Sequence, residues 1–192
     1  MRNNFVAAGL LLCLITMGQY VTAQTSKKND YNTPNLYAGI EVGSKGVKLS
    51  VIELKKNGQL GNSFFAVKDT SVNTDFISFT QQTFDATLNG LTGLFQTANT
   101  TFNIPSKRIF TVISSGVKIQ AEKEKQTAWV AKFINAFQEK INEPGRKVEV
   151  VDVMMEAKLS HQGIVPASRR YTTFLIDIGS GNSKGGFFPY GN

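Results

Sequence analysis

The stretch FLIDIGSGNSKGGFF, residues 174–188, runs from an apolar, strand-like segment into a carboxylate, several glycines, two hydroxyl groups and a lysine. A glycine-rich turn after a strand often only reverses the chain, because Gly adopts positive φ at little cost. A second stretch, YAGIEVGSKGVKLSVIEL at residues 37–54, repeats the arrangement near the other end of the sequence. In both stretches a carboxylate, Glu41 or Asp177, stands two residues before a glycine. Two such turns in one chain suggest a shared role.

Turns of this composition are suited to binding phosphate. Without Cβ atoms in the way, successive backbone N–H groups can converge on phosphate oxygens. Carboxylates that end the preceding strands can hold Mg²⁺, which prefers oxygen ligands. The sequence therefore predicts Glu41 and Asp177 as metal ligands. The predicted phosphate-binding residues of the two turns are Gly43, Ser44, Lys45, Gly46, Gly179, Ser180, Gly181, Asn182 and Ser183.

Two common phosphate motifs are absent from the sequence. No G-x-x-x-x-G-K-[ST] run occurs, which excludes a P-loop, and Lys184 stands where the GxGxxG fingerprint needs its third glycine. The alternative without a ligand is that Lys45 and Lys184 only keep exposed hairpin turns soluble. Asp177 fits that alternative poorly, because a carboxylate that ends an apolar strand is costly unless it is paired or coordinated.

The hydrophobic pattern predicts an α/β domain. Residues 37–42, 47–54 and 60–67 alternate like three strands of an antiparallel meander, and Asn57-Gly58 is a strong hairpin sequence. Helical spacing follows over about 74–99, where Gly90 and Gly93 suggest close packing against a neighbour. Further strands are expected at 108–114, 147–154 and 171–178, and further helices around 130–141 and 156–164. Strands that alternate with helices after a meander indicate a mixed sheet with helices packed on it.

The first residues resemble an export signal. Arg2 precedes an apolar run over residues 5–17, and Val21-Thr22-Ala23 is typical of a cleavage site. We therefore expect a signal peptide at residues 1–23, a flexible linker at 24–36, and a periplasmic or secreted protein with no membrane span after cleavage. Cleavage would remove the only cysteine, Cys13, which excludes internal disulfides, cysteine zinc sites and thiol catalysis.

The charge pattern favours anionic ligands other than nucleic acid. The net charge of +7 falls to +6 when Arg2 is removed, and the lysines are spread among acidic residues without a block of like charge. The aromatic residues stand at core-like spacings and not among the basic ones, so nucleic acid is not an expected partner. The single histidine, His161, cannot form a site of several histidines, and we expect it at the surface or at a helix end.

Four segments, in order, resemble the exopolyphosphatase and guanosine pentaphosphate phosphatase (Ppx/GppA) family of the actin, Hsp70 and sugar kinase superfamily. IEVGSKGVKL is similar to the first phosphate motif of the family, and ISSGVK, residues 113–118, looks like its T-S-A-x-R segment. MEAKL, residues 155–159, resembles the E-E-A-R-L helix. DIGSG, residues 177–181, resembles the second phosphate motif, D-I-G-G-G.

The resemblance implies a two-lobed enzyme that holds a polyphosphate or nucleotide polyphosphate chain with Mg²⁺ and hydrolyses its terminal phosphoanhydride. Glu156 would activate water, and Ser115 would contact phosphate. Residues 37–170 would then be the first, ribonuclease H-like lobe. Residues 171–192 would begin a second lobe that is mostly absent from this sequence, which suggests a fragment or a lobe completed by a partner, a homodimer included.

Three positions depart from the family pattern. Glu41 replaces an Asp, Met155 replaces the first Glu of the helix motif, and Lys184 replaces a terminal acid. Each change removes or displaces negative charge, so the alternative to an active hydrolase is a domain of the same fold that binds phosphate or serves as a scaffold without catalysis. An ATP-binding role of the kinase or chaperone kind is a further alternative, less expected outside the cell.

Overall fold

A computed structural model describes residues 33–57, 61–179 and 182–189 of the chain. The predicted signal peptide lies outside these residues, as do most of the predicted linker, Gly58 of the predicted hairpin, and Ser180 and Gly181 of the second turn. None of the described helices is long and apolar enough to cross a membrane.

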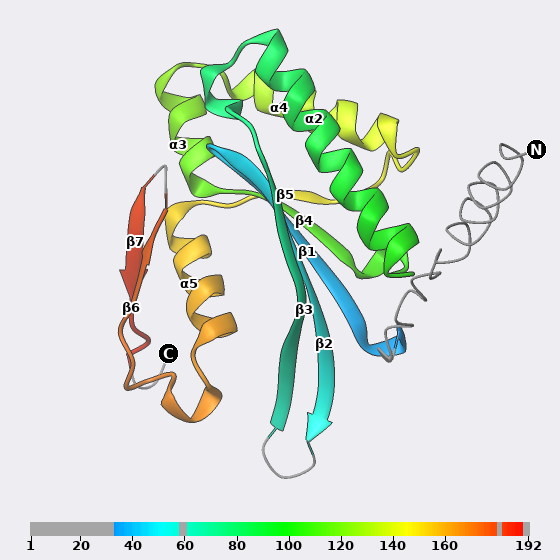
Figure 1. Cartoon of the computed structure of the whole chain (residues 1–192). Helices are drawn as coiled ribbons and strands as arrows, with labels where there is room; N and C mark the ends of the chain where they lie inside the picture. Colours follow the sequence, from blue (N-terminus) through cyan, green and yellow to red (C-terminus); the bar gives the residue numbers. More distant parts are fainter. Residues whose placement is uncertain (1–32, 58–60, 180–181, 190–192) are drawn as a thin grey trace, which may run out of the picture. The chain divides into compact units, whose positions relative to one another are not determined.

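A five-stranded mixed sheet forms the centre of the domain, in the order β3-β2-β1-β4-β5 (Figure 1). The first three strands form an antiparallel meander, and β4 and β5 extend it in parallel to β1. The predicted α/β fold class, with a meander extended by parallel strands, is therefore confirmed for this sheet. The strands of this sheet are β1 (Leu36–Gly43), β2 (Gly46–Asn57), β3 (Gly61–Asn73), β4 (Ile109–Ile113) and β5 (Val148–Val150).

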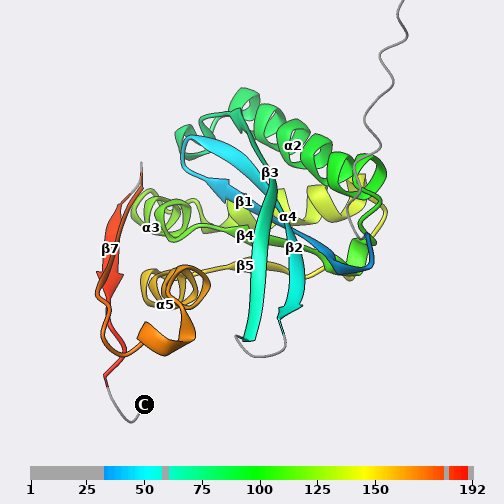
Figure 2. The same ribbon diagram turned by 60° about the horizontal axis from the view of Figure 1, so that its bottom comes forward.

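Four α-helices and a separate two-stranded hairpin complete the described structure. Helices α2 and α4 lie side by side over one face of the sheet, whereas α5 lies beside the hairpin (Figures 1 and 2). The helices are α2 (Gln81–Gln96), α3 (Ser115–Lys123), α4 (Thr127–Lys140) and α5 (Val153–Ile164). The hairpin strands are β6 (Leu175–Ile178) and β7 (Ser183–Gly186).

The core lies between the sheet and the α2–α4 layer. In β1 every second residue from Leu36 to Val42 is buried, which is the period expected for a strand with one covered face. Phe133 of α4 is fully buried, with its ring centroid 4.4 Å from that of Phe76 and 5.4 Å from that of Phe84. Offset and edge-to-face aromatic contacts of this kind add to the stabilisation from apolar burial.

A capping box accounts for the start of helix α2. The Thr80 side chain caps α2 by accepting a hydrogen bond from the backbone N–H of Thr83, and the Thr83 side chain accepts one from the backbone N–H of Thr80 in return.

The two glycines of α2 differ in their packing. A Cβ at Gly90 would lie 3.4 Å from Val72, so this glycine does pack closely. A Cβ at Gly93 would have nothing within 4 Å, so our expectation of close packing there was wrong.

Two predicted strands are too long, and one helix was missed; the strand predicted at 171–178 is confined to β6. The strand predicted at 147–154 is confined to β5, because Asp152 accepts a 2.7 Å hydrogen bond from Met155 N–H and so begins α5. Helix α3 was not predicted, because its buried positions include the small residues Ser115, Gly116 and Ala121 and its apolar period is weak.

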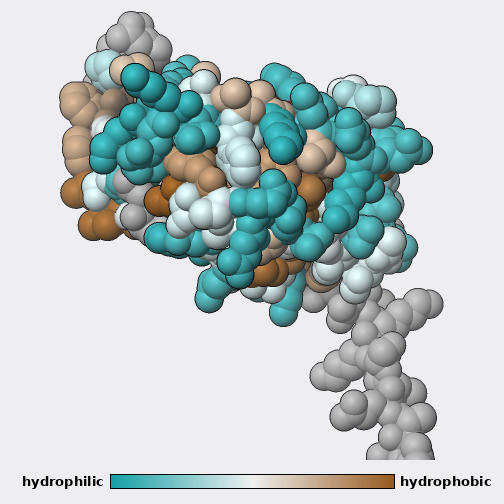
Figure 3. Space-filling model, turned by 90° about the horizontal axis from the view of Figure 1, so that it is seen from above, coloured by the Kyte–Doolittle hydropathy of each residue, from teal (hydrophilic) through white to brown (hydrophobic). Residues whose placement is uncertain are grey.

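The outer face of the hairpin is apolar and exposed. The left side of Figure 3, where β6 and β7 lie in Figure 1, is coloured as hydrophobic, whereas most of the face shown is hydrophilic. Phe174, Ile176, Ile178 and Phe187 are each exposed by more than half.

The aromatic contacts of Phe133 give a first prediction. Phe133→Ala should lower the free energy of unfolding by about 3–5 kcal/mol, through lost apolar burial and a residual cavity. Urea unfolding followed by the fluorescence of the single tryptophan, Trp129, measures it. Phe110→Ala is the control, because that side chain is 59% exposed and should cost less than about 1 kcal/mol. Equal losses for the two variants would contradict this assignment of the core.

Candidate functional site

The carboxyl ends of the parallel strands gather three chain segments at one edge of the sheet. Val42 of β1 pairs with Ile113 of β4, and the N–H of Ser114 donates to the Val42 carbonyl at 3.0 Å. On the other side of β4, Val151 N–H donates to the Ile113 carbonyl at 3.0 Å. The turn between β1 and β2, the start of α3 and the start of α5 therefore lie at the same edge (Figure 1).

Glu41 lies on β1, on the strand face opposite the core, and is half-buried. Its Oε1 atom is 3.7 Å from the position that a Cβ would take at Gly43, so the carboxylate extends toward the β1–β2 turn. Burial raises the pKa of the Glu41 carboxyl; the charge of Lys48 opposes that rise and the charge of Glu156 adds to it. The charge of Lys184 also lowers the pKa of Glu41 and that of Asp177 raises it. We call Glu41, Glu156, Asp177 and Lys184 the charged group.

Glu156 stands in the first turn of α5, and both of its carboxylate oxygens have partners. Oε2 accepts a 2.6 Å hydrogen bond from the backbone N–H of Ser115, at the start of α3. Oε1 forms a 2.9 Å ion pair with Nζ of Lys184. Burial raises the pKa of the Glu156 carboxyl, but the contacts with Ser115 and Lys184 outweigh burial and hold the pKa below its ordinary value.

Lys184 of β7 stands directly opposite Asp177 of β6 in the hairpin register. Its Nζ lies 3.0 Å from Oδ2 of Asp177, so the ammonium joins Asp177 to Glu156. The Lys184 side chain is only 4% exposed. Burial lowers the pKa of Lys184, but the two carboxylates outweigh burial and raise the pKa above its ordinary value. Lys184 is therefore fully charged at neutral pH.

A hydrogen bond joins the hairpin turn to α3. Asn182 donates from Nδ2 to Oγ of Ser115 at 2.9 Å, and its carbonyl accepts a 2.9 Å hydrogen bond from Gly179 N–H. The same residue, Ser115, also donates its backbone N–H to Glu156. Ser115 thus links the second predicted turn to the start of both α3 and α5.

The structure brings part of the predicted site together. The residues that share the charged group or contact it directly are Glu41, Ser115, Glu156, Asp177 and Asn182. Gly43, Ser44 and Gly46 belong to the adjacent β1–β2 turn, where Ser44 is buried. Ser180 and Gly181 lie outside the described residues.

Other predicted residues have structural partners of their own. Lys45 forms a 2.7 Å ion pair with Asp75 at the surface, which draws its ammonium toward the segment before α2. A Cβ at Gly46 would meet the Val72 carbonyl oxygen at 2.9 Å, so this glycine is needed for the close approach of β3. Ser183 is exposed at the start of β7.

Two buried residues were misjudged from the sequence. Lys184 was expected as a departure from the family pattern or as a residue of an accessible turn, yet it is buried between Glu156 and Asp177. Its position opposite Asp177 across the turn was the available indication. His161, expected at the surface or at a helix end, does stand in the last turn of α5, but it is 2% exposed and its Nε2 lies 2.9 Å from the Thr173 carbonyl oxygen.

The side chains of this group do not fit Mg²⁺ between Glu156 and Asp177. Mg²⁺ needs near-octahedral oxygen ligands at close range, whereas the Lys184 ammonium already lies within 3.0 Å of both carboxylates. In the part of the chain that the structure describes, no three acidic, histidine or cysteine side chains are arranged to hold a metal ion. Metal ligation by Glu41 and Asp177 stays a prediction.

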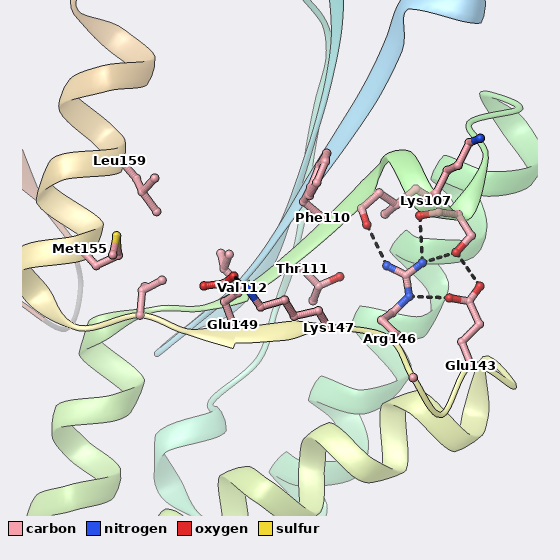
Figure 4. Close-up of a pocket in the computed structure, with 14 residues that line it drawn as sticks. Lys107, Phe110, Thr111, Val112, Glu143, Arg146, Lys147, Glu149, Met155 and Leu159 are labelled. Carbon is pink, nitrogen blue, oxygen red and sulfur yellow. Dashed lines mark hydrogen bonds and ion pairs between the residues drawn. The ribbon is translucent and has the colours of Figure 1, made fainter.

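A separate hollow of about 1000 Å³ lies beside β4, β5 and α5 and differs in chemistry (Figure 4). Phe110, Val112, Met155 and Leu159 make much of its lining apolar. The Arg146 guanidinium at one end is held by Glu143 at 2.8 Å and by two backbone carbonyls. The hollow is therefore a poor match for a phosphate chain.

Comparison with known proteins shows the fold. The sequence matches no known family profile and no curated protein. The structure is similar to the PPX-GPPA enzyme of Aquifex aeolicus, with a TM-score of 0.61, 15% identity and coverage of 80% of this chain and 48% of that one. An exopolyphosphatase of Cytophaga hutchinsonii gives a TM-score of 0.60 at 15% identity, over 82% of this chain and 47% of that one.

These likenesses confirm the predicted resemblance at the level of fold. The chain has a mixed α/β fold similar to about half of these Ppx/GppA and exopolyphosphatase structures. It spans about half the length of the solved proteins that it matches.

The partners of Glu156 give a prediction for stability against pH. Because the pKa of Glu156 is lower in the folded state, its charge stabilises the fold above the ordinary value of 4.5, and that contribution is lost as pH falls through the folded pKa. Glu156→Gln should therefore lower the free energy of unfolding by about 2 kcal/mol at pH 7, with a smaller difference from wild type near pH 3.

Urea unfolding at a series of pH values measures the difference. Glu139→Gln, on an exposed position of α4, is the matched control and should differ little from wild type at any pH. A Glu156→Gln difference that stays constant from neutral to acid pH would contradict the ionic role of this carboxylate.

Proposed function

We propose that this domain binds an oligophosphate chain, as polyphosphate or a nucleotide polyphosphate, at the charged group between the β1–β2 turn and the β6–β7 turn. The observation that carries the proposal is the convergence of Glu41, Asp177, Glu156 and Lys184 from distant parts of the sequence on one edge of the sheet. Ligands of α/β sheets characteristically bind outside the carboxyl ends of the strands.

The donors around this group suit a phosphate chain. The β1–β2 turn supplies the buried Ser44 and backbone groups between Gly43 and Gly46. Asn182 and the charged Lys184 add side-chain donors from the hairpin. The net charge of +7 also favours an anionic ligand.

In this proposal the domain by itself binds phosphate without hydrolysing it. A general base works best with a pKa near the operating pH, whereas the contacts of Glu156 lower its pKa and engage both of its oxygens. Hydrolysis is the second candidate, favoured by the likeness to enzymes about twice as long as this chain. It would need a second lobe, a change in the Lys184 contacts, and any Mg²⁺ to come with the phosphate chain.

Isothermal titration of the full chain with tripolyphosphate tests the binding. We expect saturable binding that Asn182→Ala weakens about tenfold, the effect of losing one hydrogen bond to a charged group. Asn135→Ala, on an exposed position of α4, removes the same amide far from the site and should bind like wild type.

A phosphate-release assay run beside the titration separates the two candidates. We expect release no faster than for Glu156→Gln. Release that disappears in Glu156→Gln would favour hydrolysis, and the absence of tripolyphosphate binding with or without Mg²⁺ would overturn the proposed function altogether.

A further inference from the structure

We propose that the Lys184 ammonium is a tethered cation that excludes divalent metal ions from the carboxylates of the site, so that phosphate binding is independent of Mg²⁺. The part that concerns phosphate rests on the proposed function. The exclusion of metal ions stands on the contacts of Lys184 alone.

The first step is the position of the ammonium. Nζ lies 2.9 Å from Oε1 of Glu156 and 3.0 Å from Oδ2 of Asp177, and the side chain that carries it is 4% exposed. A divalent ion that bridged the same two carboxylates would have to displace this buried charge. The displaced ammonium would then lack its ion-pair partners, which a buried charge does not tolerate.

The second step is the fixed position of the lysine and of Glu156. Lys184 is held in β7 directly opposite Asp177 of β6 by the pairing of the hairpin strands. The other oxygen of Glu156 accepts the Ser115 N–H. The register of the hairpin therefore keeps the lysine opposite Asp177 while the strands stay paired.

The third step is charge. The three carboxylates are those of Glu41, Glu156 and Asp177; Lys184 pairs with the last two, and Lys48 acts electrostatically on Glu41. A phosphate chain that approaches the turns therefore meets a cation that is already in place. A tethered ammonium neutralises phosphate oxygens as a point charge, which is one of the tasks that Mg²⁺ performs in phosphate sites.

Binding of Mn²⁺, followed by the loss of its free electron paramagnetic resonance signal, tests the exclusion without any phosphate ligand. We expect no specific site in the full-length wild-type chain. Lys184→Met, which removes the charge but keeps an unbranched apolar side chain, should bind Mn²⁺ at least about tenfold more tightly than wild type, through the freed carboxylates.

The matched control is Lys147→Met. Lys147 pairs with Glu149, but its side chain is 82% exposed, so the same loss of charge at the surface should leave Mn²⁺ binding unchanged. Lys184→Arg keeps a cation and should exclude Mn²⁺ like wild type; it carries the test if Lys184→Met fails to fold by circular dichroism. Stoichiometric Mn²⁺ binding to wild type or to Lys184→Arg would overturn the proposal.

Tripolyphosphate titration in EDTA and in Mg²⁺ completes the test. We expect binding in EDTA that added Mg²⁺ does not strengthen. Binding that requires Mg²⁺ would overturn the inference while leaving the proposed phosphate site in place. Absence of tripolyphosphate binding in both conditions would overturn the proposed function, whereas the Mn²⁺ measurement would still decide whether Lys184 excludes metal ions.

Discussion

The ammonium of Lys184 is buried between two carboxylates, and the arrangement of the carboxyl-end edge of the sheet depends on that contact. A buried charge is strongly unfavourable unless opposite charges and hydrogen bonds compensate for its loss of hydration. Because Asp177 belongs to β6, Lys184 to β7 and Glu156 to α5, their ion pairs tie the hairpin to α5. The hydrogen bond from Ser115 to Glu156 extends the connection to α3 and so to the central sheet.

In the proposed function, the same contacts separate binding from hydrolysis. The β1–β2 turn and Asn182 lie beside the charged group at the carboxyl-end edge of the sheet. Glu156 is the ion-pair partner of Lys184 and the acceptor for the Ser115 N–H, and these contacts hold its pKa below the ordinary value, which does not favour a role as general base. We propose on these grounds that the domain binds phosphate without hydrolysing it.

The sequence was sufficient for the mixed sheet with helices packed on it. Alternation in the first three strands predicted the meander, and this prediction is confirmed because it depends on a local period. The joint role of Glu41 and Asp177 stays a prediction; the two carboxylates influence each other electrostatically.

The remaining features depend on contacts between distant residues. The burial of Lys184 requires Glu156, which belongs to another element, and no local pattern encodes that pairing. Helix α3 is short and covered through small residues such as Gly116, so its hydrophobic period is weak. Gly46 belongs to a turn with the composition of a phosphate-binding turn. The close approach of the Val72 carbonyl on β3, however, explains why a glycine is needed at this position.

Lys184 and Glu156 interact as a buried, compensated ion pair. A double-mutant cycle with Lys184→Met and Glu156→Gln, measured as free energies of unfolding at neutral pH, tests it most directly. We expect a coupling energy of about 2 kcal/mol or more, well above the roughly 0.5 kcal/mol of an exposed pair. Additive effects of the two substitutions, with a coupling energy near zero, would contradict it.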